Sequence, residues 1–122
     1  MNSITFTIPL PPHEVRNNAR CHYRAKAAKI KFYRRLTMYA AREAAGWKKP
    51  MWLKASAKVV AYFPTVQHMD PTNLLDALKG PFDGLEDAGI IVNDRELWPE
   101  RPVIHTKQTN PRIEITITEE TL

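Results

Sequence analysis

The sequence predicts an α+β fold in which a small mixed sheet is packed with two helices. Apolar and polar residues alternate in segments 3–8 and 112–118, which is typical of half-buried strands. Segment 25–47 instead has a helical period and is rich in alanine, which favours a long helix. The chain has 122 residues with no internal repeat or linker, so we expect one domain spanning 1–122.

The composition indicates a folded protein with a basic surface. Hydrophobic residues make up 43% of the chain, and 18 Lys and Arg against 13 Asp and Glu leave a net charge of +5. Such a surface suits a phosphate polymer. The chain shows no apolar run of membrane-spanning length and no recognisable signal peptide, so we expect a cytoplasmic protein without a membrane partner. The single cysteine, Cys21, excludes an internal disulfide and a thiolate zinc site built from the chain's own cysteines.

The first half of the chain is expected to form strand, helix and strand in that order. Prolines end the first strand, and a polar loop follows to about residue 24. In the helix over 25–47, an apolar stripe faces the core and basic residues lie on the opposite side. The stripe consists of Tyr33, Leu36, Ala40, Ala44 and Trp47. The second strand is predicted over 52–63, where Pro64 ends it.

The second half is expected to form a helix over 73–87 followed by strands. The buried stripe of this helix consists of Leu74, Leu78, Phe82 and Leu85. Pro81 lies inside the helix, so we expect a kink there. Segment 90–92 is predicted as a short apolar strand or edge. The last two strands are predicted to pair as a hairpin over 103–118, with its turn at Asn110-Pro111.

The stretch from Asp70 to Asp94 holds the residues that suggest a chemistry. On the helix, four polar residues at i, i+4, i+7 and i+11 share the face opposite the leucines. They are Thr72, Asp76, Lys79 and Asp83. Asp70 precedes this face and Asp94 returns after the helix, and oxygen ligands from separate segments suit Mg²⁺. The spacing alone favours a plainer interpretation, a solvated face with an Asp–Lys ion-pair ladder.

Several short motifs follow one another in this stretch in a fixed order. They are Asp70-Pro71-Thr72-Asn73-Leu74, Lys79, Phe82-Asp83-Gly84-Leu85, Asp87-Ala88-Gly89 and Asn93-Asp94. This order resembles the RusA-type crossover-junction endodeoxyribonucleases, whose motif is Asp-x-Asp-Asn-Leu, a lysine, Asp-x-Leu, Ala-Gly and Asp-Asp. The opening strand that runs into prolines, the Asn-rich loop before a basic helix and the final strand ending Ile-Thr-Glu also match, so the resemblance covers most of the chain.

The resemblance implies an endonuclease that needs Mg²⁺ or Mn²⁺ and resolves four-way (Holliday) DNA junctions in recombination and repair. It further implies a homodimer with one site per subunit, no nucleotide cofactor, and a bacterial or prophage origin. The metal-binding carboxylates of the family fall on Asp70, Thr72 and Asp94, and its active-site lysine falls on Lys79, which stabilises the phosphorane.

Two positions depart from the family motif. Thr72 stands where the family has aspartate, and Asn93 replaces the first residue of the Asp-Asp pair. Asp76 lies one helical turn beyond Thr72, so we expect it to restore the missing negative charge. Asp83 is expected to orient Lys79 or a metal-bound water.

The expected DNA contacts lie in the loop before the long helix and on the basic side of that helix. They are Asn17, Asn18, Arg20, His22, Arg24, Lys31, Arg34 and Arg35, with Tyr23 and Arg42 nearby. An ordinary solvated face is the alternative for the helix, and a local hydrogen bond is the alternative for His22. Two other functions remain open: a branched-DNA-binding protein of the same fold with weakened or lost catalysis, and a basic RNA-binding module.

Overall fold

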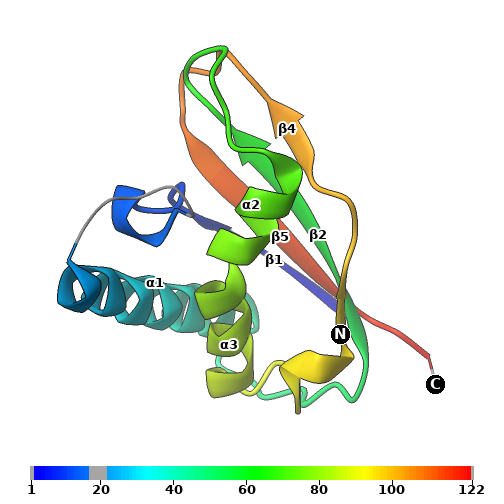
Figure 1. The fold of residues 1–122 in the computed structure, drawn as a ribbon. Coiled ribbons are helices and arrows are strands. Elements are labelled where there is room, and N and C mark those ends of the chain that lie inside the picture. Colours follow the sequence, from blue (N-terminus) through cyan, green and yellow to red (C-terminus); the bar gives the residue numbers. More distant parts are fainter. Residues whose placement is uncertain (1, 17–21, 122) are drawn as a thin grey trace.

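The computed structural model describes residues 2–16 and 22–121, and Figure 1 shows their arrangement. The strands are β1 (Ser3–Ile8), β2 (Ala55–Tyr62), β3 (Leu97–Pro99), β4 (Val103–His105) and β5 (Arg112–Glu119). The helices are α1 (Tyr23–Ala44), α2 (Pro71–Ala77) and α3 (Lys79–Asp87), with short 3₁₀ helices η1 (His13–Val15) and η2 (Asp94–Glu96). The loop residues Asn17, Asn18, Arg20 and Cys21 lie outside the described residues, so the expectations for them stay predictions.

The strands form one mixed sheet in the order β1-β5-β2-β3, and β4 also pairs with β2. β5 is antiparallel to both β1 and β2, whereas β3 and β4 run parallel to β2. β3 pairs with the start of β2 at residues 55–57, and β4 pairs with its end at residues 60–62. Both short strands therefore share the edge of β2 that β5 leaves open.

The predicted hairpin over 103–118 is wrong, because β2 lies between β4 and β5. β5 pairs along its length with β1 on one side and β2 on the other. A central position satisfies the hydrogen-bonding groups on both edges of β5, whereas pairing with the short β4 would leave most of one edge unpaired. The same position buries Ile113, Ile115 and Ile117 completely.

The core lies between one face of the sheet and the helices, which lie together on that side (Figure 1). Alternate residues of β1, β2 and β5 are buried, as their apolar periodicity predicts, and the residues between them are exposed or partly buried. Leu74, Leu78 and Leu85 of the central segment are fully buried against this face, so three residues of the predicted leucine stripe are confirmed, while Phe82 is only partly buried.

The buried stripe of α1 differs from the predicted one. Tyr33, Thr37 and Ala41 are its buried residues. Ala44 and Trp47, which were expected in the core, are exposed, and the Trp47 exposure is 65%. Tyr33 is confirmed, and Leu36 and Ala40 of the predicted stripe are partly buried against the core. The fully buried residues repeat every fourth residue from Tyr33, so the buried side of the helix is turned toward Thr37 and Ala41 relative to the prediction.

A close contact between α1 and α3 at Gly84 explains the rotation. A Cβ added to Gly84 would lie 2.5 Å from the Arg34 carbonyl oxygen and 3.3 Å from the Met38 nitrogen. It would also lie 3.4 Å from the Cβ of Thr37, whose hydroxyl donates to the Tyr33 carbonyl at 2.8 Å. Helices this close admit only small side chains between them, and the in-helix hydrogen bond satisfies the buried threonine.

The predicted helix over 73–87 is in fact two helices that meet at Leu78. Leu78 has φ −91° and ψ 5°, and it ends α2 and begins α3. Pro81 then lies in the first turn of α3, where backbone N–H groups make no intrahelical hydrogen bond, so a proline without an N–H costs nothing there. Phe82 N donates to the Leu78 carbonyl at 2.9 Å as α3 begins. A new helix start therefore replaces the expected kink.

The predicted α+β class is confirmed by a five-stranded mixed sheet packed with helices. The element order differs from the expected one because the central helix is divided and because β3 adds a strand to the edge of β2. Segment 90–92 contributes only a bridge between Ile91 and Trp52. In the described part of the chain, no helix combines the length and the apolar character needed to cross a membrane.

Candidate active site

The break between α2 and α3 places Asp76 and Lys79 on either side of Leu78, where both line a pocket of about 390 Å³. Asp94, at the start of η2, lines the same pocket. The remaining walls are apolar and consist of Leu75, Phe82, Leu97 and Pro99. Two carboxylates and one ammonium group thus share an otherwise apolar pocket, which is a suitable place for a cation or a phosphate.

Hydrogen bonds hold the turn that carries Asp94. Asn93 Oδ1 accepts from the Arg95 nitrogen at 2.9 Å and so caps η2. The Asp94 nitrogen donates to Glu86 Oε2 at 3.3 Å, which ties the turn to α3. Asn93-Asp94 therefore forms a turn, which brings Asp94 to the helix that carries Asp83.

Asp83 and Asp94 form a close carboxylate pair. Burial raises the pKa of Asp83 most strongly, and a hydrogen bond with Asp94 and repulsion from its charge raise it further. Arg34 acts against this rise, with its Nη1 3.9 Å from Asp83 Oδ2. Two neighbouring carboxylates repel each other unless a proton or a cation lies between them. The pair is therefore a candidate for binding a cation.

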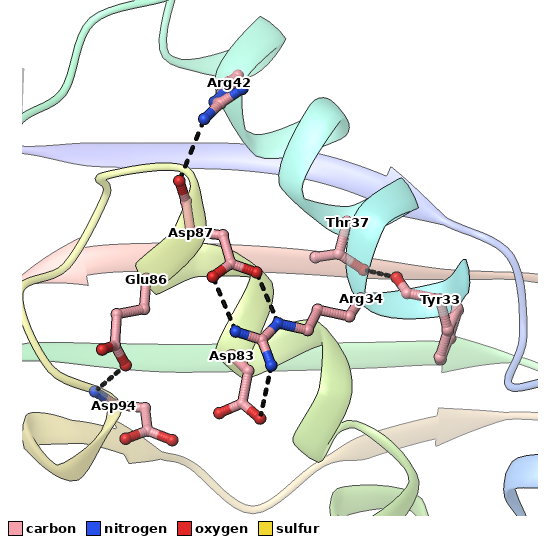
Figure 2. A network of polar contacts seen from close by, with 8 residues as sticks. All are labelled: Tyr33, Arg34, Thr37, Arg42, Asp83, Glu86, Asp87 and Asp94. Atoms are coloured by element: carbon pink, nitrogen blue, oxygen red, sulfur yellow. Dashed lines mark hydrogen bonds and ion pairs between the residues drawn. The ribbon is translucent and has the colours of Figure 1, made fainter. Parts of the chain in front are cut away.

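Arg34 joins α1 to α3 through a bidentate ion pair with Asp87 (Figure 2). Its Nε lies 2.6 Å from Asp87 Oδ2, and its Nη2 lies 2.8 Å from Oδ1. These hydrogen bonds raise the pKa of Arg34 and lower that of Asp87. Arg42 also contacts α3, since its Nη2 donates to the Asp87 main-chain oxygen at 3.2 Å. Arg34 is thus exposed as predicted but bound to α3, whereas Arg42 is partly buried against α3 and does not lie on the solvent side as predicted.

A second pocket, of about 290 Å³, is bordered by α1 and the start of α3. Asp76, Lys79 and Asp83 line it together, so three residues of the predicted polar face do converge. Lys26 of α1 adds a further cation to this pocket. Asp76 and Lys79 line both pockets and therefore lie on the boundary between them.

Asp70 and Thr72 lie at the start of α2 and line neither pocket. Asp70 is the N-cap, and its Oδ1 accepts from the Thr72 nitrogen at 3.2 Å. Thr72 is exposed on the first turn. Within residues 2–16 and 22–121, no group of three His, Cys, Asp or Glu side chains is close enough to bind a metal ion. The expected ligand set of Asp70, Thr72 and Asp94 is thus not assembled by protein atoms alone.

The expected DNA contacts on α1 fall into separate groups. His22 caps the helix, its Nδ1 accepting from the Arg24 nitrogen at 3.2 Å, and it stacks on Tyr23 with ring centroids 4.6 Å apart. Lys31 and Arg35 are exposed and line a groove of about 480 Å³ beside the helix. His22 therefore has the local hydrogen bond that was its alternative role, while Lys31 and Arg35 remain accessible to a phosphate.

Sequence reasoning missed the roles of Glu86, Asp87 and Lys26. Glu86 anchors the turn of Asp94, Asp87 binds Arg34, and Lys26 lines the pocket of Asp76. Arg34 and Asp87 lie 53 residues apart, and Glu86 and Asp94 lie eight residues apart on either side of a turn, so helical spacing could not have indicated these contacts. The one available signal was the Glu-Asp pair that ends the central helix, because two carboxylates there invite cationic partners from another element.

Comparison of the chain with protein-family models and with curated protein sequences finds no match in either.

Proposed function

We propose that the protein is a Mg²⁺- or Mn²⁺-dependent endonuclease that cuts four-way DNA junctions, as its resemblance to the RusA-type enzymes implies. The observation that carries this proposal is the pocket shared by Asp76, Lys79 and Asp94, beside which Asp83 pairs with Asp94. The net charge of +5 favours a nucleic-acid substrate, and the affinity of the protein for such a substrate should fall as the salt concentration rises.

The side chains of the pocket fit a hard divalent cation. Asp76 and Asp94 line the pocket, and Asp83 lies beside it and pairs with Asp94, so the Asp83–Asp94 pair would hold the cation with Asp76 nearby. Mg²⁺ is commonly held by one or two carboxylates with water and substrate phosphate completing its shell, so three converging protein carboxylates are not required. Such a cation, when bound, activates water and stabilises the charge that develops on the scissile phosphate.

The chain's own residues position the substrate. Lys79 brings a positive charge into the same pocket as Asp76 and Asp94, where it binds a phosphate oxygen that gains negative charge during cleavage. Lys79 is exposed, so its ammonium group can meet a phosphate at the mouth of this pocket, beside the apolar side chains of Phe82 and Leu97. Asp70 serves the site indirectly by capping α2, the helix that ends beside Asp76.

A homodimer belongs to the proposal. A four-way junction has two equivalent strands to cut, and a two-fold assembly with one pocket in each subunit matches that symmetry. The assembly can be measured independently of cleavage by analytical ultracentrifugation of the protein alone.

The test is cleavage of a synthetic four-way junction with Mg²⁺, with Mn²⁺ and with excess chelator, against a linear duplex of the same sequence. We expect metal-dependent cutting of the junction by the parent protein, and losses of at least about 100-fold in Lys79→Met and Asp94→Asn. Glu120→Gln, at an exposed position near the C-terminus, is the matched control and should cut normally. Failure of the parent protein to cut at any concentration of either metal would exclude the nuclease function.

A branched-DNA-binding protein without cleavage is the second candidate. It is favoured by the position of Asp70 and Thr72 outside the pocket and by the replacement of the family's aspartate with Thr72. Tight, salt-sensitive junction binding without cutting would select this candidate. An RNA-binding module would instead show no preference for the junction over a linear duplex.

A further inference from the structure

The outward side of α1 carries exposed aromatic side chains between cationic ones. Phe32 is 56% exposed and Tyr39 is 52% exposed. Arg35, also exposed, lies three residues after Phe32 and four before Tyr39, so all three share one side of the helix. The Lys29 ammonium lies 5.8 Å from the centroid of the Phe32 ring and adds a cation one turn earlier. Two exposed aromatic rings on one side of a helix, with cationic side chains between and beside them, form a surface that can take part in binding.

The charge of α1 selects the kind of partner that this side can bind. Its basic residues are Arg24, Lys26, Lys29, Lys31, Arg34, Arg35 and Arg42. Glu43 is the acidic residue of the helix, and it lies in its last turn. Arg34 and Arg42 contact α3, yet Lys29, Lys31 and Arg35 remain on exposed positions. This excess of positive charge is complementary to a polyanion and opposes the approach of a second copy of the same helix.

The exposed aromatic rings indicate that the polyanionic partner has unpaired bases. In a duplex the base faces are stacked on one another, so side chains projecting from a helix cannot lie against them. In a single strand each base face is free to stack on an aromatic ring while arginine and lysine contact the phosphates. Phe32 and Tyr39 are seven residues apart, which is about 10.5 Å along the helix axis, so their rings are placed for two different bases.

A neighbouring groove extends this side of the helix. Its charged lining consists of Lys31, Arg35 and the Arg34–Asp87 ion pair, which leaves Lys31 and Arg35 as the cations available to a phosphate. Its apolar surface comes from Ala27, Ile30 and Met38. Its volume of about 480 Å³ is enough for part of a nucleotide to lie beside the cationic side chains. The strand's backbone therefore has a path next to the two rings.

We propose that the outward side of α1 binds single-stranded DNA, with Phe32 and Tyr39 stacking on unpaired bases and Arg35 contacting the phosphate chain between them. The proposal shares with the proposed function only its nucleic-acid partner and needs neither a metal ion nor cleavage. In a branched DNA, such a surface would hold an unpaired segment while the pocket of Asp76 and Asp94 engages the phosphate to be cut.

The experiment measures binding by fluorescence anisotropy in chelator, so that cleavage cannot contribute. The probes are a labelled oligothymidine strand, an abasic strand of the same length and charge, and a duplex. Phe32→Leu and Tyr39→Leu keep apolar bulk and helix propensity but remove the ring. Trp47→Leu is the matched control, because Trp47 is 65% exposed and lies beyond the end of α1. Thermal unfolding of each variant verifies that the fold is kept.

We expect the parent protein to bind the oligothymidine strand more tightly than the abasic strand. Each leucine variant should lose about 5-fold or more in affinity for the base-bearing strand and little for the abasic strand, whereas Trp47→Leu should lose neither. Equal affinity of the parent for both strands, or unchanged binding by both leucine variants, would overturn the proposal. The proposal would also be overturned if the protein formed a dimer through this side of α1 and the dimer competed with binding of the single strand. Junction cleavage is scored separately, so a failure of the nuclease function leaves this test intact.

Discussion

The contact between α1 and α3 at Gly84 supports a quantitative prediction for Gly84→Ala. The added methyl group would meet the Arg34 carbonyl oxygen at 2.5 Å and the Met38 nitrogen at 3.3 Å. Both neighbours are main-chain atoms of a regular helix, so neither can rotate away as a flexible side chain would. The helices must then separate, which also pulls Arg34 from its 2.6 Å contact with Asp87.

The expected magnitude follows from two opposing effects. Overpacking a close contact costs about 1–3 kcal/mol, and rigid main-chain neighbours place this site at the upper end. Alanine in place of glycine recovers about 1 kcal/mol of helix propensity. We therefore expect the free energy of unfolding to fall by about 2 kcal/mol, which lowers the melting temperature by about 8 °C for a chain of this size.

Gly80→Ala is the matched control, because Gly80 lies in the same helix and is also buried. A Cβ there would lie 3.4 Å from the Ile30 carbonyl oxygen and 3.5 Å from Ile30 Cγ2, which are ordinary contacts. Its unfolding free energy should be unchanged or slightly increased. Urea denaturation monitored by circular dichroism measures both variants. If Gly84→Ala unfolds at the same urea concentration as Gly80→Ala, the close approach of the two helices is not as described.

Three further predictions follow from the polar contacts. The pKa of Asp87 is lowered by Arg34, so their ion pair stabilises the native protein above about pH 4 and is lost below it. Asp87→Asn should therefore lower the unfolding free energy by about 0.5–1 kcal/mol at neutral pH and by almost nothing in acid, as urea denaturation at the two pH values measures. The pKa of Asp83 is raised, chiefly by burial and then by Asp94, so its charged form disfavours folding at neutral pH. Asp83→Asn should therefore stabilise the metal-free protein by up to about 1 kcal/mol at neutral pH. It should also abolish the rise in stability that the parent protein shows when the pH is lowered through the raised pKa of Asp83. A lower melting temperature of the variant at neutral pH would contradict this reasoning. The Tyr33 hydroxyl donates to a main-chain carbonyl at 2.6 Å, so Tyr33→Phe should cost about 1–2 kcal/mol in chemical denaturation, and an unchanged midpoint would show that water replaces the bond.

The candidate site was partly visible in the sequence. Helical spacing brought Asp76, Lys79 and Asp83 to one side, and the structure places all three along one pocket. The spacing could not show that Asp94 pairs with Asp83, because that contact depends on how the turn after α3 folds back. Helical spacing also could not show that the Asp70 carboxylate caps the start of α2 by accepting a hydrogen bond from the Thr72 nitrogen.

The sequence by itself determined the features that depend on local periodicity and turn chemistry. Alternation in β1 and β5 predicted which side chains are buried, because successive residues of a strand point to opposite faces. The class of the fold followed from equally local signals. The resemblance to the RusA-type nucleases also comes from the sequence, and it stays a prediction until the junction assay is done.

Only the tertiary structure decided which elements became neighbours. β4 and β5 are close in the chain, yet β2 separates them because β5 gains hydrogen bonds along both of its edges in the centre of the sheet. The orientation of α1 depended on Gly84, a residue far away in the sequence that allows the two helices to touch. That contact turns Arg34 toward Asp87 and leaves Phe32 in solvent. Contacts of this kind depend on shape complementarity between distant segments, which the pattern within one segment does not contain.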